Sequence, residues 1–467
     1  MKIENLNGVG AIELTQAYAR GEMDPSSALD VYLEAADASR GVFTTVLKQR
    51  AQDEARASTI RWRAGRPLSP LDGVPVAWKD LFDVRGEVTT AGSETRRYEP
   101  LARADSFVVA QATRAGMICM GKTNLSEFAY SGLGINPHYG TPVNPHNLAG
   151  RRVPGGSSSG SAIALVTGCA PVSMATDTAG SIRVPAAFNG LVGFKPSSRR
   201  YAKDGLFPLS TTLDCIGPLA FNVADCIALD RILRGDCNAL PPQRDDDLAG
   251  RRFVVDHQIL SDSRLAPAVR VNTEKVIGTL RRAGARIESR SLSSLTRVSE
   301  LDACCSWLGS IEAFALHRTL LNSPRAAALD PRVRTRLETT RVVSAACYIE
   351  LCAERLQLID AVRDELGGAA LILPTVAHTA PDLASLEADD ALFASVNLKT
   401  LWLTKFASFL DMVAISLPSG ADQDGLPTGI QLLLPSQQED KALILASLIE
   451  TALIDHRDDG GVESVAG

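Results

Sequence analysis

Two clusters rich in glycine and serine occupy the middle of the chain, at residues 154–161 (PGGSSSGS) and 177–183 (DTAGSIR). Residues 162–176 between them are mostly small and apolar, which favours a segment that crosses the core as a helix followed by a strand. A flexible Gly/Ser linker is disfavoured because apolar sequence lies on both sides of the first cluster. Both clusters are therefore predicted to be ordered.

Two chemical interpretations of the first cluster follow from its residues. A glycine-rich loop can bind phosphate through backbone N–H groups, but no Gly-Lys-Ser/Thr follows here, as a P-loop would require. Residues 156–160 match the G-x-S-x-G nucleophile elbow, which would make Ser158 the nucleophile of a Ser-His-Asp esterase. That elbow requires a hydrophobic strand before it, and residues 151–155 (RRVPG) are typical of a loop.

A recurring pattern of helix, glycine and short apolar run indicates the fold class. It occurs at residues 107–120 and again at 269–287 and 358–373. Such alternation is typical of an α/β sheet that is covered by helices. No long linker interrupts it, so we expect one large domain over residues 1–467, with a helical excursion at about 292–363.

Composition excludes several classes of function. The 467 residues include 48 Lys plus Arg and 54 Asp plus Glu. This excess of acidic residues argues against a nucleic-acid partner. There is no apolar run of the about 20 residues that span a bilayer, and no signal-peptide pattern, so no membrane partner is expected. The nine cysteines and six histidines lack metal-ligand spacing, which favours a reduced cytoplasmic setting without a metal. Cys304 and Cys305 are predicted to be buried.

Taken together, the two clusters resemble the signature of the amidase signature family of serine hydrolases. The match comprises the Gly/Ser run, the small apolar spacer and the sequence D-T-x-G-S-I-R-x-P at 177–185. The resemblance is densest over about 71–220, and it implies a single amidase domain built on a large mixed central β-sheet with helices on both sides. Similar motifs stand at 71–80 (LDGVPVAWKD), 121–128 (GKTNLSEF), 188–196 (FNGLVGFKP) and 425–432 (GLPTGIQL).

The resemblance implies a Ser–Ser–Lys triad, with Ser181 as the nucleophile, Ser157 as the bridging serine and Lys79 as the base. The chemistry is sensible in itself, because a serine hydroxyl needs a neighbouring base. A lysine with its ordinary pKa of about 10.4 is protonated at pH 7, but burial lowers that pKa by several units. The apolar run 74–78 would carry Lys79 into the core. The alternative is that Lys79 pairs with Asp80 or with another carboxylate.

Further roles also come from the resemblance. Lys122 matches a family position that is not the catalytic lysine, and a cis peptide bond is implied between Gly156 and Ser157. Arg183 either binds a substrate carboxylate or pairs with Asp177. The backbone N–H groups expected to stabilise the oxyanion are those of Thr178, Ala179, Gly180 and Ser181, and the residues expected near the acyl pocket are Ala129 and Tyr130.

The implied reaction is hydrolysis of a carbon–nitrogen amide bond of a small molecule through an acyl-enzyme, without a metal or an organic cofactor. One alternative is the A subunit of a tRNA-dependent amidotransferase, although that protein typically has Gln where this chain has Val184. Another is a carbamate or urea-type hydrolase of the carboxybiuret kind, because the acyl-enzyme chemistry is shared. Family members commonly form homodimers, so a homodimer is compatible with the resemblance.

Overall fold

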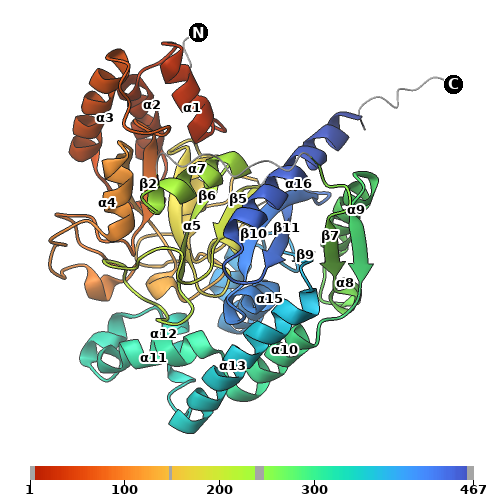
Figure 1. Ribbon diagram of the computed structural model, residues 1–467. Coiled ribbons are helices and arrows are strands. Elements are labelled where there is room, and N and C mark those ends of the chain that lie inside the picture. The colour runs from red at the N-terminus through yellow and green to blue at the C-terminus, as the bar shows by residue number, and fades with distance from the viewer. Residues whose placement is uncertain (1–5, 147–149, 237–246, 460–467) are drawn as a thin grey trace.

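The structure is a computed structural model that describes residues 6–146, 150–236 and 247–459. Within these residues a mixed sheet of 11 strands runs through the molecule, with helices packed on both faces (Figure 1). This confirms the α/β class and the large mixed sheet expected from the sequence. The strands are β1 (Phe43–Val46), β2 (Pro75–Lys79), β3 (Ile118–Thr123), β4 (Val172–Asp177), β5 (Val192–Lys195), β6 (Cys215–Ala220), β7 (Arg252–Val255), β8 (Arg286–Ser289), β9 (Ala370–Pro374), β10 (Val413–Ala421) and β11 (Pro427–Leu434).

The strand order gives β2 a parallel neighbour on each side. The sheet runs β1-β3-β2-β4-β6-β5-β10-β11-β9-β7-β8. β2 is parallel to β3 and to β4, whereas β1 and β6 pair antiparallel with the outer sides of β3 and β4. The carboxyl ends of β2, β3 and β4 therefore meet at one edge of the sheet, and ligand sites of α/β proteins commonly lie at such an edge.

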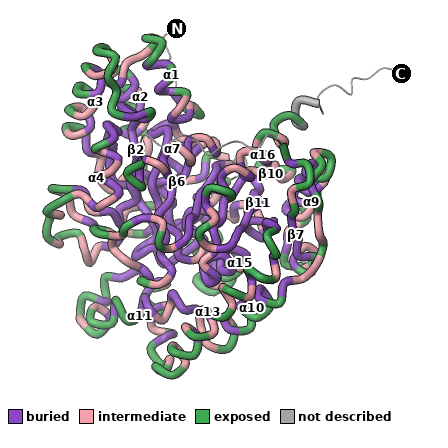
Figure 2. The backbone as a smooth tube through the Cα atoms, in the orientation of Figure 1, coloured by how far each residue is buried: buried purple, intermediate pink, exposed green. Residues whose placement is uncertain are grey.

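Side chains alternate between the two faces of the sheet, and each face has its own helices. In β11, Ile430 and Leu432 pack against one set of helices and Leu433 against the other. Figure 2 shows the buried residues concentrated along the central strands between these layers. The first face is covered by α4 (Phe107–Arg114), α7 (Val223–Leu233), α9 (Pro267–Arg282) and α16 (Glu439–Asp459). The opposite face is covered by α2 (Pro25–Ala38), α3 (Lys48–Arg63), α5 (Ser159–Val166), α6 (Arg183–Asn189), α10 (Ser293–Cys305), α13 (Ala345–Leu366) and α15 (Asp390–Phe409).

The helix–glycine–strand units predicted from the sequence are all present, as α4 with β3, α9 with β8 and α13 with β9. The helix and strand predicted between the two Gly/Ser clusters are α5 and β4. α13 begins at Ala345, well before the predicted start at 358, because the Ser344 side chain accepts the backbone N–H of Cys347 and caps the helix. The region 292–363 is helical, with α11 (Leu308–Leu321) and α12 (Pro331–Glu338) between α10 and α13.

Short elements complete the described part of the chain. None of the helices in these ranges has the length and apolar character needed to cross a membrane. The remaining elements are α1 (Ala11–Ala19), α8 (His257–Ser261), α14 (Leu383–Ala388) and the 3-10 turns η1 (Glu94–Arg96), η2 (Glu127–Ala129) and η3 (Pro324–Ala328).

The prediction that Cys304 and Cys305 are buried is wrong. Cys304 is exposed and Cys305 is half-buried, with their Sγ atoms 3.2 Å apart. The buried stripe of α10 passes through Val298 and Leu301, and the two cysteines form the last turn, where the helix ends. Cys305 still packs against the core on one side, whereas Cys304 lies outside the buried stripe of the helix and faces solvent.

Candidate active site

Lys79 is the last residue of β2 and is fully buried. Val76 and Trp78 point to one face of the sheet and Ala77 to the other, so the alternation of the strand turns Lys79 towards the face covered by α5 and α6. Its Nζ donates to Ser157 Oγ at 2.7 Å and to Thr176 Oγ1 at 2.8 Å. Thr176 belongs to the parallel neighbour β4, so the sheet itself places this partner.

Burial lowers the pKa of Lys79 from 10.5 to about 7. The nearby carboxylates of Asp214 and Asp177 raise the pKa, but their effect is smaller than that of desolvation. About half of the Lys79 side chains are then neutral at pH 7, with a lone pair on Nζ. A neutral amine at hydrogen-bond distance from a serine hydroxyl can accept its proton.

Within the described residues, Lys79 forms no ion pair with Asp80 or with any other carboxylate, and its Nζ contacts only hydroxyl groups. Asp80 instead forms an ion pair with Lys122, with 2.6 Å between Lys122 Nζ and Asp80 Oδ1, and both side chains are buried. Lys122 Nζ also donates to the backbone oxygen of Val88 and to Thr89 Oγ1, each at 2.9 Å. The Asp80 carboxylate is therefore bound by the neighbouring Lys122, and it is not among the groups that shift the pKa of Lys79.

Replacement of Lys122 by methionine is expected to reduce the free energy of unfolding by about 3–5 kcal/mol, because it leaves the buried Asp80 carboxylate without its partner. Urea unfolding followed by circular dichroism measures this loss. The double replacement Lys122→Met with Asp80→Asn removes the unpaired charge and should recover part of it. A single variant that loses less than about 1 kcal/mol would show that the pair is not important for stability.

Ser157 lies in the loop that leads into α5. The peptide bond between Gly156 and Ser157 is cis, as the resemblance implies. A Cβ on Gly156 would lie 2.5 Å from the backbone nitrogen of Gly134, so only glycine fits there. The Ser157 carbonyl accepts the backbone N–H of Ser126 at 3.1 Å, which attaches this loop to the segment after β3.

The nucleophile-elbow interpretation of Ser158 is not supported. No strand precedes Ser158 in the described residues from 150 onward, and the hydroxyl of Ser158 donates to the backbone oxygen of Thr176 at 3.4 Å. No titratable side chain of the described residues makes a hydrogen bond with this hydroxyl, so the structure shows no base for Ser158. This contact also places the Ser157 loop against the end of β4, from which the Ser181 loop starts.

Ser181 lies in the short loop between β4 and α6 and is 4% exposed. The loop is held by Asp177, whose carboxylate accepts the backbone N–H groups of Gly180 at 2.7 Å and Ile182 at 3.2 Å. Arg183 forms a two-pronged ion pair with the same carboxylate, each N–O distance being 2.9 Å. Burial opposes ionisation of Asp177, but the guanidinium and the hydrogen bonds hold the pKa of Asp177 below its ordinary value.

The fully buried Arg183 also donates to Gln431 on β11 and to Ser408 on α15. Of the two roles considered for this arginine, the structure shows the ion pair with Asp177. Its guanidinium fixes the Ser181 loop to β11 and α15 in the core. Because Asp177 already serves as its carboxylate partner, the ion pair accounts for this arginine.

The residues predicted to stabilise the oxyanion differ in whether their backbone N–H groups already make a hydrogen bond. The N–H of Gly180 is engaged by Asp177, whereas the N–H groups of Ala179 and Ser181 make no hydrogen bond among the described residues. The Ala179 carbonyl accepts the Thr404 hydroxyl at 2.5 Å, and a Cβ on Gly180 would lie 2.3 Å from Thr404 Oγ1. The Thr178 hydroxyl donates to Asp214 at 2.5 Å. Side-chain contacts on both sides thus hold the turn in one conformation.

Ala129 and Tyr130 are buried in a cluster that includes Phe128 and Leu337. Ala129 is at the end of η2 with a positive φ of 60°, and the Tyr130 ring lies 4.5 Å below the guanidinium carbon of Arg336. Tyr130 is therefore packed inside the protein. Phe128, which the sequence analysis did not single out, is the residue of this segment that lines a cavity.

Comparisons with known proteins place the chain in a family. The sequence profile of the family described as Amidase matches residues 28–443. The chain is 32% identical to 2-amino-5-chloromuconic acid deaminase of Comamonas testosteroni, with 86% of this chain and 87% of that protein covered. It is 30% identical to the A subunit of the glutamyl-tRNA(Gln) amidotransferase of Salinispora arenicola, with 96% and 98% covered. A solved structure described as an amidase superimposes with a TM-score of 0.83 at 31% identity, over 95% of this chain and 99% of that one. The chain therefore belongs to the amidase signature family and is a hydrolase that acts on non-peptide carbon–nitrogen bonds.

Proposed function

We propose that the protein hydrolyses the amide bond of a small molecule through an acyl-enzyme on Ser181, with Ser157 and Lys79 as the proton relay. The observation that carries the proposal is the buried contact of 2.7 Å between Lys79 Nζ and Ser157 Oγ, together with a Lys79 pKa of about 7. A surface lysine would be protonated and could not act as a base at neutral pH.

In the proposed acylation step, Ser181 Oγ attacks the carbonyl carbon and a C–O bond forms. The carbonyl electrons move to oxygen, where the N–H groups of Ala179 and Ser181 would receive the charge. The Ser181 proton passes to Ser157 Oγ as the Ser157 proton passes to Lys79 Nζ. The intermediate then collapses, the C–N bond breaks, and the proton held by Lys79 returns through Ser157 to the leaving amine. Water repeats the sequence in place of the amine and releases the acid.

The substrate is proposed to be a small amide. The relative from Comamonas testosteroni is named for a substrate that is a carboxylic acid, and a carbamate or urea-type substrate would use the same acyl-enzyme steps. The similarity to the amidotransferase protein covers nearly the whole chain and supports that role as the second candidate. Val184, where the amidotransferase protein typically has Gln, favours the stand-alone enzyme. The eight described cysteines are free thiols, compatible with the cytoplasmic setting that we propose.

Turnover by the purified chain alone separates these candidates. The chain by itself, as a monomer or a homodimer, is expected to release ammonia from simple amides such as benzamide, measured with a coupled ammonia assay. Size-exclusion chromatography with light scattering gives its assembly in the same preparation. Release of ammonia only after partner proteins are added would contradict the stand-alone proposal and favour the amidotransferase role.

A further inference from the structure

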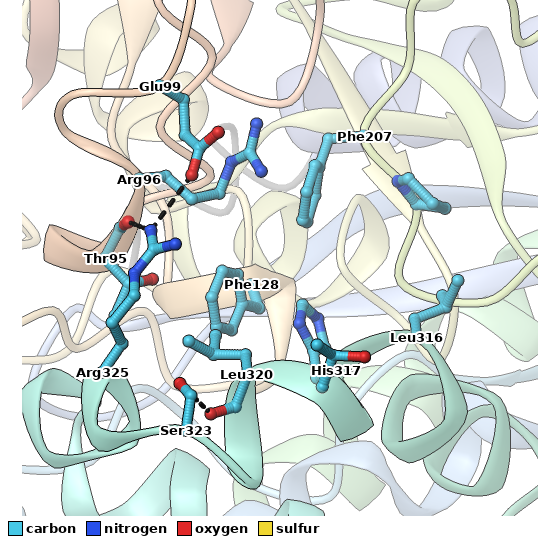
Figure 3. A pocket seen from close by; sticks show the side chains of 12 residues that line it. Thr95, Arg96, Glu99, Phe128, Phe207, Leu316, His317, Leu320, Ser323 and Arg325 are labelled. Atoms are coloured by element: carbon cyan, nitrogen blue, oxygen red, sulfur yellow. Dashed lines mark hydrogen bonds and ion pairs between the residues drawn. The ribbon is translucent and has the colours of Figure 1, made fainter.

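A cavity of about 390 Å³ lies between η1, the segment around Phe207 and α11. Its apolar wall is a group of three rings (Figure 3). Phe128 stacks on His317 with 4.1 Å between ring centroids, and on Phe207 with 5.9 Å. The polar side chains that line the cavity include Arg96, Arg325 and Glu99.

The charges in this cavity do not cancel. Glu99 forms an ion pair with Arg325 at 3.0 Å, drawn as a dashed line in Figure 3. Arg96 has no ion pair among the described residues; its Nε donates to the backbone oxygen of Thr89 at 2.9 Å, and its guanidinium carbon lies 4.3 Å from the centroid of Phe207. The carboxylates of Glu99, Asp83 and Asp80 act on this guanidinium electrostatically, but none forms an ion pair with it. Its terminal N–H groups remain donors, and the two arginines outnumber the one glutamate among the residues that line the cavity.

His317 supplies a second unsatisfied polar group. It is 5% exposed, and its Nε2 is buried without a hydrogen-bond partner among the described residues. Burial lowers the pKa of His317 to about 4, so the ring is neutral at pH 7 and one nitrogen carries a proton that it can donate. A buried polar atom without a partner costs free energy, so an incoming acceptor would be favourable here.

Two short links join the cavity to the proposed catalytic residues. Phe128 stands two residues, at most about 7 Å of chain, after Ser126, whose N–H donates to the Ser157 carbonyl. On the other side, Phe207 and Pro208 are followed by Leu209, whose N–H donates to the Asp214 carboxylate at 2.9 Å. Asp214 in turn accepts a hydrogen bond from the hydroxyl of Thr178, in the turn that carries the predicted oxyanion groups. Along the chain, residues that line the cavity therefore adjoin both segments that the proposed reaction would use.

We propose that this cavity is a substrate subsite that binds a carboxylate attached to an aromatic or unsaturated body, through Arg96 and His317 Nε2. The proposal rests on the proposed amide hydrolysis at Ser181, and it names the substrate class as amides that also carry a carboxylate. The guanidinium meets the carboxylate, His317 donates to it, and Phe128 and Phe207 contact the apolar body.

Binding of benzoate tests the subsite without any need for turnover. Isothermal titration calorimetry is performed on the unsubstituted chain and on the Arg96→Gln, Arg97→Gln and His317→Phe variants. Arg97 is the matched control, because it is exposed, adjacent, and paired with Glu94 at 2.7 Å. We expect Arg96→Gln to weaken benzoate binding about tenfold or more, His317→Phe about threefold, and Arg97→Gln less than about twofold. No saturable binding to the unsubstituted chain, or equal effects at Arg96 and Arg97, would overturn the proposal.

Kinetics with matched amides test whether the cavity serves the reaction. Arg96→Gln is expected to raise KM for 4-carbamoylbenzoate about tenfold while it changes KM for the neutral 4-methylbenzamide less than about twofold. Benzoate should inhibit hydrolysis competitively. Benzoate binding without competition would assign the cavity to a separate ligand and overturn the subsite. Failure of the catalytic proposal gives a different result. Turnover would then persist in Ser181→Ala, whether or not benzoate binds or inhibits.

Discussion

Replacement of Ser181 by alanine is expected to reduce kcat for amide hydrolysis by about 10⁴–10⁶-fold, because it removes the oxygen that we propose forms the ester bond of the acyl-enzyme. The change should leave the fold intact. The loop that carries Ser181 is held by Asp177, Arg183 and Thr404, none of which uses the Ser181 hydroxyl. Ammonia release gives the rate, and urea unfolding confirms that the variant is folded.

Ser158→Ala is the matched control for this variant. Ser158 is the other serine that a sequence motif offers as a nucleophile, and its hydroxyl only donates to a backbone oxygen at 3.4 Å. We expect kcat of Ser158→Ala to stay within about tenfold of the unsubstituted protein. If Ser158→Ala abolished turnover and Ser181→Ala did not, the nucleophile would have to be reassigned.

Lys79→Met should lower kcat by about 10³–10⁴-fold and should also remove the acid limb of the pH–rate profile. The direction of the pH dependence follows from the lowered pKa of Lys79. Because the pKa of Lys79 is about 7, the neutral fraction rises from about a tenth at pH 6 to about nine tenths at pH 8, so kcat/KM should rise over this range. Methionine keeps the apolar length of the side chain without the amine. Stopped assays from about pH 5.5 to 9 measure the profile.

The pH profile distinguishes a proton acceptor from a merely structural lysine. The Thr176→Val variant removes the second hydrogen bond of Lys79 Nζ, at 2.8 Å, but keeps the amine. It should retain a rising limb, displaced along the pH axis, whereas Lys79→Met should have none. A Lys79→Met variant with the same rising limb would show that another group is the base.

Local pattern was enough to predict the elements that carry the candidate site. The small apolar spacer predicted α5 and β4, and the run of apolar residues before Lys79 predicted its burial. Periodicity and short-range spacing are properties of the sequence alone, which is why these predictions are confirmed. For Arg183 the sequence left two roles open, an ion pair with Asp177 or contact with a substrate carboxylate, and the structure shows the ion pair.

Contacts between distant segments were beyond the sequence pattern. Thr176 reaches Lys79 only because β4 is the parallel neighbour of β2, and the partner of Ala179 is Thr404, 225 positions away. Asp80 stands next to Lys79 in the chain, but it lies in the turn after β2 and pairs with Lys122 of the neighbouring strand β3. The cavity between Arg96 and His317 depends in the same way on how α11 packs against η1 and η2. Such pairings are set by strand order and helix packing.

Covalent labelling with a fluorophosphonate, followed by peptide mapping, identifies the activated serine of this protein. We predict a label on Ser181 in the unsubstituted protein and much slower labelling in Lys79→Met, because the probe reacts only with an activated serine. A label on Ser158 or on any serine other than Ser181, or equal labelling rates with and without the Lys79 amine, would contradict it.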